Sequence, residues 1–119
     1  MSALIQTRDQ KMAKYAASCI EKVKDGKEFK SIARSFPSLI MANGLGQALA
    51  FLNAKDKSWH KQLYQFISEW VSDKAYAQKG KDILQLIMAN DSRHYTRALQ
   101  EAMAISVWIK RFAEAEFKD

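Results

Sequence analysis

The sequence predicts an all-α fold: a compact antiparallel bundle of five to six helices forming a single domain over residues 1–119. Helix-forming residues such as Ala, Lys, Gln, Leu and Glu dominate, and the alternation typical of strands is hard to find. Hydrophobic residues make up 48% of the chain and there is one proline, which favours a folded domain over disorder. A chain of 119 residues can also bury a core without disulfides or metals.

The first helix is expected to begin at Thr7, after a flexible tail formed by residues 1–6. Gln10, three residues after Thr7, completes a capping box, and Gly26 is expected to end the helix. The core face of this helix carries Met12, Ala16, Cys19, Ile20 and Val23 at helical spacing.

A short helix over residues 27–34 is expected next, followed by a boundary at Pro37, because the residue before a proline resists helical geometry. The stretch from Pro37 to Leu52 is apolar on nearly every side, which predicts a buried helix at the centre of the fold. A small, amide-bearing strip on it consists of Asn43, Gly46, Gln47 and Ala50. We interpret this strip as a close helix crossing, with a ligand pocket as the alternative.

Three further segments complete the predicted bundle. Ser58 is expected to cap an amphipathic helix, residues 74–81 to form a basic connection, and residues 83–88 to form a short helix. A start signal at residues 90–92 opens the last helix, expected from about Arg93 to Phe117. The inward stripe after Ser58 is Trp59, Leu63, Phe66, Ile67 and Trp70. The core face of the last helix is Tyr95, Ala98, Leu99, Ala102, Met103, Ser106, Ile109 and Ala113.

Residue types that carry catalysis are sparse and isolated. His60 and His94 belong to no metal-binding or catalytic motif, and Cys19 falls on an inward helix face, where thiols are usually inert. We therefore expect no catalytic residue, no metal and no cofactor. A lone cysteine fits a reducing compartment, and no apolar run approaches the roughly 18 residues of a membrane span, so a cytoplasmic location is expected.

The basic residues point to a polyanionic partner. Lys and Arg number 19 against 13 acidic residues. On the last helix, three arginines share one sector with Trp108, opposite the core face: Arg93, Arg97 and Arg111. Arginine pairs with phosphates and tryptophan stacks on bases, but the same two residues anchor protein interfaces. Packing of Trp108 on another helix is the third interpretation.

The first helix carries a second basic face. Its members are Arg8, Lys11, Tyr15 and Lys22, with Lys14 close beside it. Loop lysines extend it: Lys55, Lys57, Lys74, Lys79 and Lys81. Such cations contact backbone phosphates without reading sequence, although lysines on helices often only keep a surface soluble. We predict nucleic-acid contacts for Arg8, Lys11, Lys14, Lys22, Arg93, Arg97 and Arg111, and partner contacts for Trp108 and Tyr15.

Several stretches together resemble a known family. They are residues 36–40 (FPSLI), 44–52 (GLGQALAFL), 13–16 (AKYA), 95–102 (YTRALQEA) and 108–115 (WIKRFAEA). In joint order they are similar to the small all-helical subunit of the type III-B CRISPR effector, the Cmr complex. The similarity extends over most of the chain and contains no catalytic motif.

This resemblance implies a non-catalytic part of a larger assembly. In the family, several copies stack along a filament of larger backbone subunits, and they help hold the target RNA paired to the guide while the backbone subunits cut it. The expected partners are the backbone and large subunits, guide RNA, target RNA and adjacent copies of the chain. The alternative is a helical adaptor that joins proteins without touching nucleic acid, and an enzyme of unrecognised type ranks third.

Overall fold

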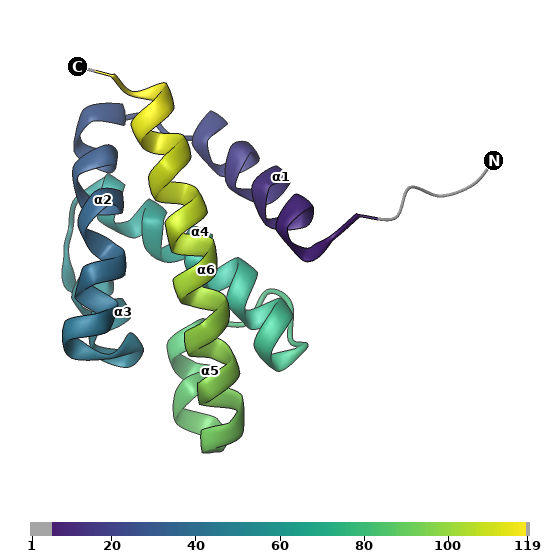
Figure 1. Cartoon of the computed structure of the whole chain (residues 1–119). Coiled ribbons are helices and arrows are strands. Elements are labelled where there is room, and N and C mark those ends of the chain that lie inside the picture. Colours follow the sequence, from purple (N-terminus) through teal and green to yellow (C-terminus); the bar gives the residue numbers. More distant parts are fainter. Residues whose placement is uncertain (1–5, 119) are drawn as a thin grey trace.

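The computed structural model describes residues 6–118 and contains, within them, six α-helices and no strand (Figure 1). The all-α prediction is confirmed. Apart from Gln6, the predicted tail lies outside the described residues. No helix in the described range is long and apolar enough to cross a membrane. The helices are α1 (Arg8–Glu21), α2 (Gly26–Asn43), α3 (Leu45–Ala54), α4 (Ser58–Tyr76), α5 (Ile83–Ala89) and α6 (Ser92–Glu116).

Helix α6 is the element against which three of the other helices assemble. It packs against α1, α2 and α4, and Figure 1 shows it in front, with α1 on one side, α2 and α3 on the other, and α4 behind. Its fully buried hydrophobic residues are Ala98, Ala102, Ile105, Ile109 and Ala113. Small side chains on this arc let neighbouring helices approach closely. The centre of the bundle is therefore α6, and not the stretch from Pro37 to Leu52.

The start of α1 was predicted correctly and its end was not. Thr7 Oγ1 accepts from the Gln10 amide at 3.1 Å, and the Gln10 side chain accepts from the Thr7 amide at 2.7 Å. The helix ends at Glu21, whereas Gly26 begins α2. Gly26 lies so close to the ring of Phe117 that a Cβ atom would clash with it. Glycine at this position therefore allows the start of α2 to pack closely against the end of α6.

Pro37 does not break the helix in which it lies, so the predicted boundary there was wrong. Helix α2 runs through it, and Pro37 is buried between Phe36 and Ile40. A proline inside a helix costs about 3 kcal/mol. Burial of two large apolar side chains, at about 1.5–3 kcal/mol each, offsets that cost.

The break occurs instead at Gly44, which separates α2 from α3. Its φ of 85° and ψ of 160° lie in a region that almost only glycine adopts. The break removes the predicted strip: Asn43, Gln47 and Ala50 are exposed, and nothing lies within 4 Å of where a Cβ of Gly46 would be. The expected close helix crossing at this strip is therefore wrong.

The second half of the chain follows the predicted order with shifted boundaries. Ser58 is the first residue of α4 and not its cap, and its hydroxyl donates to Asp25 at 3.0 Å. Helix α4 continues to Tyr76, so the connection begins at Ala77 with a left-handed φ of 53°. The start signal before α6 is confirmed, because the side chain of Asp91 accepts from the backbone amide of His94 at 3.1 Å. Trp59 is only half-buried, whereas the rest of its predicted stripe is buried.

The conformation of Gly44 yields a stability prediction. Gly44→Ala is expected to lower the free energy of unfolding by about 1–3 kcal/mol, because alanine adopts this φ and ψ only with a strained backbone. The nearest atom to an added Cβ, the Tyr95 hydroxyl at 3.7 Å, would not clash, so the loss would come from the backbone. Gly46→Ala is the control and is expected to gain up to about 1 kcal/mol, since it fills open space in a helix. Equal urea midpoints for the two variants would contradict this account.

Candidate nucleic-acid interface

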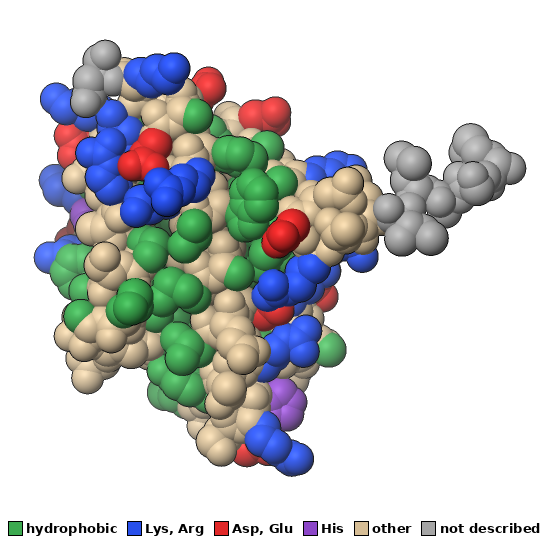
Figure 2. All heavy atoms as spheres, viewed as in Figure 1, with side chains coloured by type: hydrophobic (Ala, Val, Ile, Leu, Met, Phe, Trp, Pro, Cys, Tyr) green, Lys and Arg blue, Asp and Glu red, His purple; other side chains and the backbone are tan. Residues whose placement is uncertain are grey.

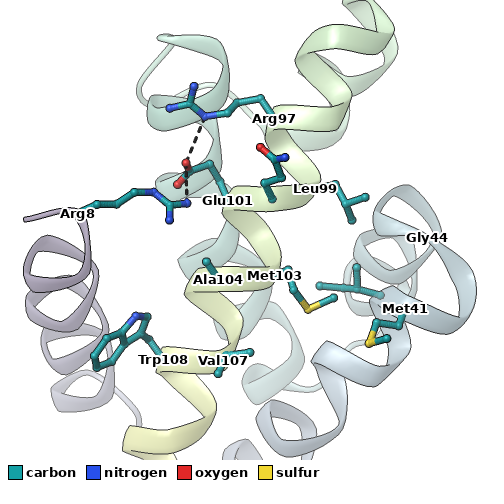
Figure 3. Close-up of a pocket in the computed structure, with 12 residues that line it drawn as sticks. Arg8, Met41, Gly44, Arg97, Leu99, Glu101, Met103, Ala104, Val107 and Trp108 are labelled. Carbon is teal, nitrogen blue, oxygen red and sulfur yellow. Dashed lines mark hydrogen bonds and ion pairs between the residues drawn. The ribbon is translucent and has the colours of Figure 1, made fainter.

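A buried carboxylate, Glu101 of α6, organises the basic residues at the junction of α1, α4 and α6. Its side chain is only 3% exposed. Oε2 accepts from Arg8 Nη2 at 2.9 Å and from Arg97 Nε at 3.2 Å, and Oε1 accepts from Trp70 Nε1 at 3.0 Å. Figure 3 shows Glu101 between the two arginines, with Arg8 reaching across from α1. We call these four residues the Glu101 clamp.

The electrostatics of Glu101 fit an ionised carboxylate. Burial raises the pKa of this carboxyl, but the hydrogen bonds from Arg8, Trp70 and Arg97 and the nearby positive charge outweigh burial, so the pKa lies below its ordinary value. A buried charge is tolerated when it is paired and fully hydrogen-bonded, which three donors achieve here.

Two lysines complete a basic surface around the clamp. Lys11 and Lys74 line a hollow of about 220 Å³ together with Arg8, Arg97, Trp70 and Glu101. The ammonium of Lys74 lies 5.0 Å from the centre of the Trp70 ring. In Figure 2, Lys and Arg side chains gather beside the first turn of α1 and the amino-terminal half of α6. We call Arg8, Lys11, Lys74 and Arg97 the basic junction.

The remaining predicted cations lie apart from the hollow. Arg93 and Arg97 border a neighbouring depression with His94, and Arg93 is 90% exposed, with Asp91 at 3.4 Å. Lys14 is exposed on α1. Lys22, which caps the end of α1, and Arg111 of α6 are each fourteen residues beyond Arg8 and Arg97, about 21 Å at 1.5 Å per residue.

Arg111 also has a different electrostatic setting from the basic junction. Its guanidinium is 3.5 Å from Glu114, which in turn pairs with Arg34 at 3.3 Å. Near the end of α6, positive and negative side chains therefore alternate, as Figure 2 shows in its upper part. Exposed pairs of this kind interact weakly.

An apolar groove runs along α6 and includes the clamp residues Arg8, Arg97 and Glu101 in its lining. It has a volume of about 1060 Å³ and lies between α6 and the end of α2. Met41 is 79% exposed in it and Val107 is 38% exposed. The Trp108 ring is half-buried and lies 5.6 Å from the Phe112 ring in an edge-to-face arrangement. Figure 2 shows hydrophobic side chains running along this part of the surface.

Tyr15 is held mainly by contacts within the protein. Its hydroxyl donates to the Phe66 carbonyl at 2.6 Å, and its ring centre is 5.1 Å from that of Trp70. Burial raises the pKa of Tyr15 strongly. Part of its surface remains accessible, so its predicted role in partner binding stays a prediction.

The side chains with catalytic potential lie in separate places. His60 contacts Phe51 and Trp59, whereas His94 stacks on Tyr76 with ring centres 5.5 Å apart. Burial raises the pKa of Cys19 to about 12, which keeps its thiol protonated. Within residues 6–118, no three His, Cys, Asp or Glu side chains gather in a way that could hold a metal ion.

Sequence reasoning missed the role of Glu101. One local signal was present, since Arg97 and Glu101 are four residues apart on a helix. A second was the position of Glu101 between Ala98 and Ala102 on the buried arc, where a charged residue demands a partner. Its other donors, Arg8 and Trp70, lie 93 and 31 residues away in sequence, so no local pattern could identify them.

Removing Glu101 is expected to destabilise the bundle. Glu101→Ala should lower the free energy of unfolding by about 2 kcal/mol, because it leaves the indole N–H of Trp70 buried without an acceptor. Arg8→Ala should cost less, since Glu101 would keep two donors and Arg8 is half exposed. Urea denaturation at neutral pH measures both losses. A larger loss for Arg8→Ala would contradict the assignment of the carboxylate as the common partner.

The lowered pKa of Glu101 also predicts a pH dependence. A carboxyl whose pKa is lower in the folded than in the unfolded state stabilises the fold fully above the unfolded value, about 4.3 for Glu. That contribution is lost as pH falls through the folded pKa. The stability difference between the native chain and Glu101→Gln should therefore shrink between pH 5 and the acid limit, as about one proton is taken up. Urea denaturation across this pH range measures the stability of both proteins. A stability difference that stayed constant with pH would contradict the assignment.

Comparison with known proteins identifies the family. A family described as "CRISPR-associated protein (Cas_Cmr5)" matches residues 8–116. The chain is 29% identical over 119 residues to the "CRISPR system Cmr subunit Cmr5" of Thermus thermophilus, covering 93% of this chain and 96% of that protein. An X-ray crystal structure of a Cmr5 family protein from the same organism matches with a TM-score of 0.78 and 27% identity, over 96% of this chain and all of that one. The expected resemblance is confirmed, and the chain belongs to the Cmr5 family, subunits of type III-B CRISPR Cmr complexes.

Proposed function

We propose that this chain is a non-catalytic subunit that holds RNA in the Cmr complex through the basic junction. Membership of the Cmr5 family makes it a subunit that assembles with other Cmr subunits. The observation that carries the RNA assignment is the gathering of four cations from three helices around a single buried carboxylate. Four cations and one anion line the hollow, and Asp73 pairs with Lys74 at 3.5 Å, so positive charge remains in excess, which suits a polyanion.

The chemistry of the basic junction favours phosphate over base recognition. Guanidinium groups donate in a planar fork to phosphate oxygens, and lysine adds a mobile point charge. The Trp70 ring lies beneath Lys74 and is buried, so it is unavailable for stacking on a base. Binding here would follow the backbone of guide or target RNA without reading its sequence.

The non-catalytic part of the proposal rests on the separation of the reactive side chains. His60 and His94 have different aromatic neighbours, and Cys19 is a buried, protonated thiol. A general base must lie within hydrogen-bond reach of the group it activates, and neither histidine lies next to Cys19 in this fold. In this proposal, copies stack along the backbone filament in the cytoplasm and support antiviral RNA cleavage carried out by other subunits.

The apolar groove favours a second function, that of an adaptor between proteins. Exposed Met41 and Val107 with half-buried Trp108 form the kind of apolar, aromatic patch that anchors interfaces. The contacts proposed for Trp108 are with a neighbouring Cmr subunit, either the backbone subunit, the large subunit or another copy. Groove and basic junction are adjoining and share Arg8, Arg97 and Glu101 in their linings, so one subunit could engage protein and RNA together.

The RNA assignment is tested with residues that do not belong to the Glu101 clamp. Lys11→Ala with Lys74→Ala should weaken binding of target RNA by the assembled complex, and should lower the slope of log affinity against log salt by about one to two. The control pair is Lys27→Ala with Lys118→Ala, which removes equal charge beside Phe117. Lys27 is next to Gly26, which packs on Phe117, sixteen residues or about 24 Å along α6 from Glu101. Equal salt slopes for both pairs would reject the basic junction as an RNA site.

The adaptor function is tested with two equally exposed methionines. Met41→Ser in the groove should weaken incorporation into the Cmr complex at least about fivefold, the range of a modest interface anchor. Met88→Ser on α5 is the control, because Met88 is 71% exposed and lies outside the groove. Pull-down of the labelled chain with the other Cmr subunits measures both. If the Met41 variant is incorporated as well as the native chain, the groove has no role in assembly.

A further inference from the structure

We infer that Glu101 is a positioning residue for phosphate binding. Its buried carboxylate holds the guanidinium groups of Arg8 and Arg97 as one pre-oriented fork for a single backbone phosphate. The inference rests on the proposed contact between the basic junction and RNA. It goes further by assigning a function to an acidic residue, which simple charge arguments would count as unfavourable to RNA.

The first support is the way the carboxylate is fixed. Arg8 and Arg97 donate to the same oxygen, Oε2, from two different helices. The other oxygen accepts from Trp70 Nε1, and the Trp70 side chain is itself buried. The carboxylate therefore cannot turn without losing a buried hydrogen bond, so its orientation determines where both guanidiniums lie.

The second support is the spacing of the two guanidiniums. Arg8 Nη2 and Arg97 Nε lie 2.9 and 3.2 Å from one oxygen atom, so they are at most about 6 Å apart, the sum of the two distances. Two forks at that spacing can reach oxygens of the same phosphate group. Figure 3 shows the two side chains approaching Glu101 from opposite directions.

The third support is that most donors remain available. Arg8 uses only Nη2, which leaves Nη1 and Nε, and Arg97 uses only Nε, which leaves Nη1 and Nη2. These remaining nitrogens have no hydrogen-bond partner among residues 6–118, and the side chains are 55% and 57% exposed. Because the clamp already restricts both side chains, binding a phosphate would cost less rotamer entropy than it would for free arginines.

Positioning and net charge predict opposite effects for one substitution, which makes the inference testable. Glu101→Gln removes the one negative charge that lines the hollow, so the net charge there rises by one. If net charge governed RNA binding, the variant would bind more tightly. If Glu101 orients the fork, the variant should bind more weakly, because one carboxylate oxygen that accepts both arginines is replaced by a weaker, neutral acceptor.

The experiment measures affinity of the reconstituted complex for a labelled RNA complementary to its guide. Glu101→Gln should weaken binding about five- to tenfold. The matched control is Asp9→Asn, which makes the same charge change on an exposed residue next to Arg8 and leaves the clamp intact. Asp9→Asn should bind RNA as tightly as the native chain or more tightly. Native or tighter binding by Glu101→Gln would overturn the inference.

A double-mutant cycle separates this inference from the proposed function. Arg8→Ala with Arg97→Ala should weaken RNA binding, and adding Glu101→Gln in that background should change affinity no further. If the arginine pair has no effect, the RNA site itself is wrong. If the arginine pair matters but Glu101→Gln does not, only the positioning role is wrong.

If circular dichroism shows that Glu101→Gln does not fold, a charge-preserving variant tests the inference instead. Arg8→Lys with Arg97→Lys keeps every charge but removes the planar fork. It should lose about as much affinity as Glu101→Gln is expected to lose, while keeping a near-native salt slope. Native affinity for this lysine pair would show that charge alone suffices and would overturn the inference.

Discussion

The Glu101 carboxylate is the interaction on which the structure around the basic junction depends. It joins α1 and α4 to α6 through two hydrogen bonds, from Arg8 and from the buried indole of Trp70, and it accepts a third from Arg97 of α6 itself. A buried ion pair is often weak as a source of stability, because desolvation offsets the attraction. Here the arginines remain half exposed, so they keep part of their hydration while the carboxylate gains full hydrogen bonding. The clamp therefore combines a connection between helices with a surface that retains free donors.

The surfaces of α6 show how one helix can serve several tasks. Its buried arc is rich in alanine and packs closely against neighbouring helices. Its outer surface carries the basic junction and the apolar groove, which share Arg8 and Arg97. Glu101 lies where these surfaces meet. The proposed protein-binding and RNA-binding surfaces therefore meet on one helix.

Local features were predictable from the sequence, and long-range ones were not. The capping box at Thr7 and the start of α6 at Asp91 depend on residues three positions apart, so local chemistry determines them. The boundary at Pro37 was wrong because tertiary burial outweighed a local preference, and the true break at Gly44 uses a backbone conformation that almost only glycine adopts. Arg8 and Arg97 were correctly placed on exposed faces, but their common partner depends on helix packing.

The hydrogen bond from Trp70 to Glu101 makes the fluorescence of Trp70 sensitive to the state of the Glu101 clamp. An indole whose N–H donates to a charged group emits according to the field that it experiences. Any anion that drew Arg8 or Arg97 away from the carboxylate would alter that field, so the emission of a single buried fluorophore would report occupancy of the hollow without an attached dye. Trp59 and Trp108 lie elsewhere in the bundle, and replacing them with phenylalanine would leave Trp70 as the sole source of the signal.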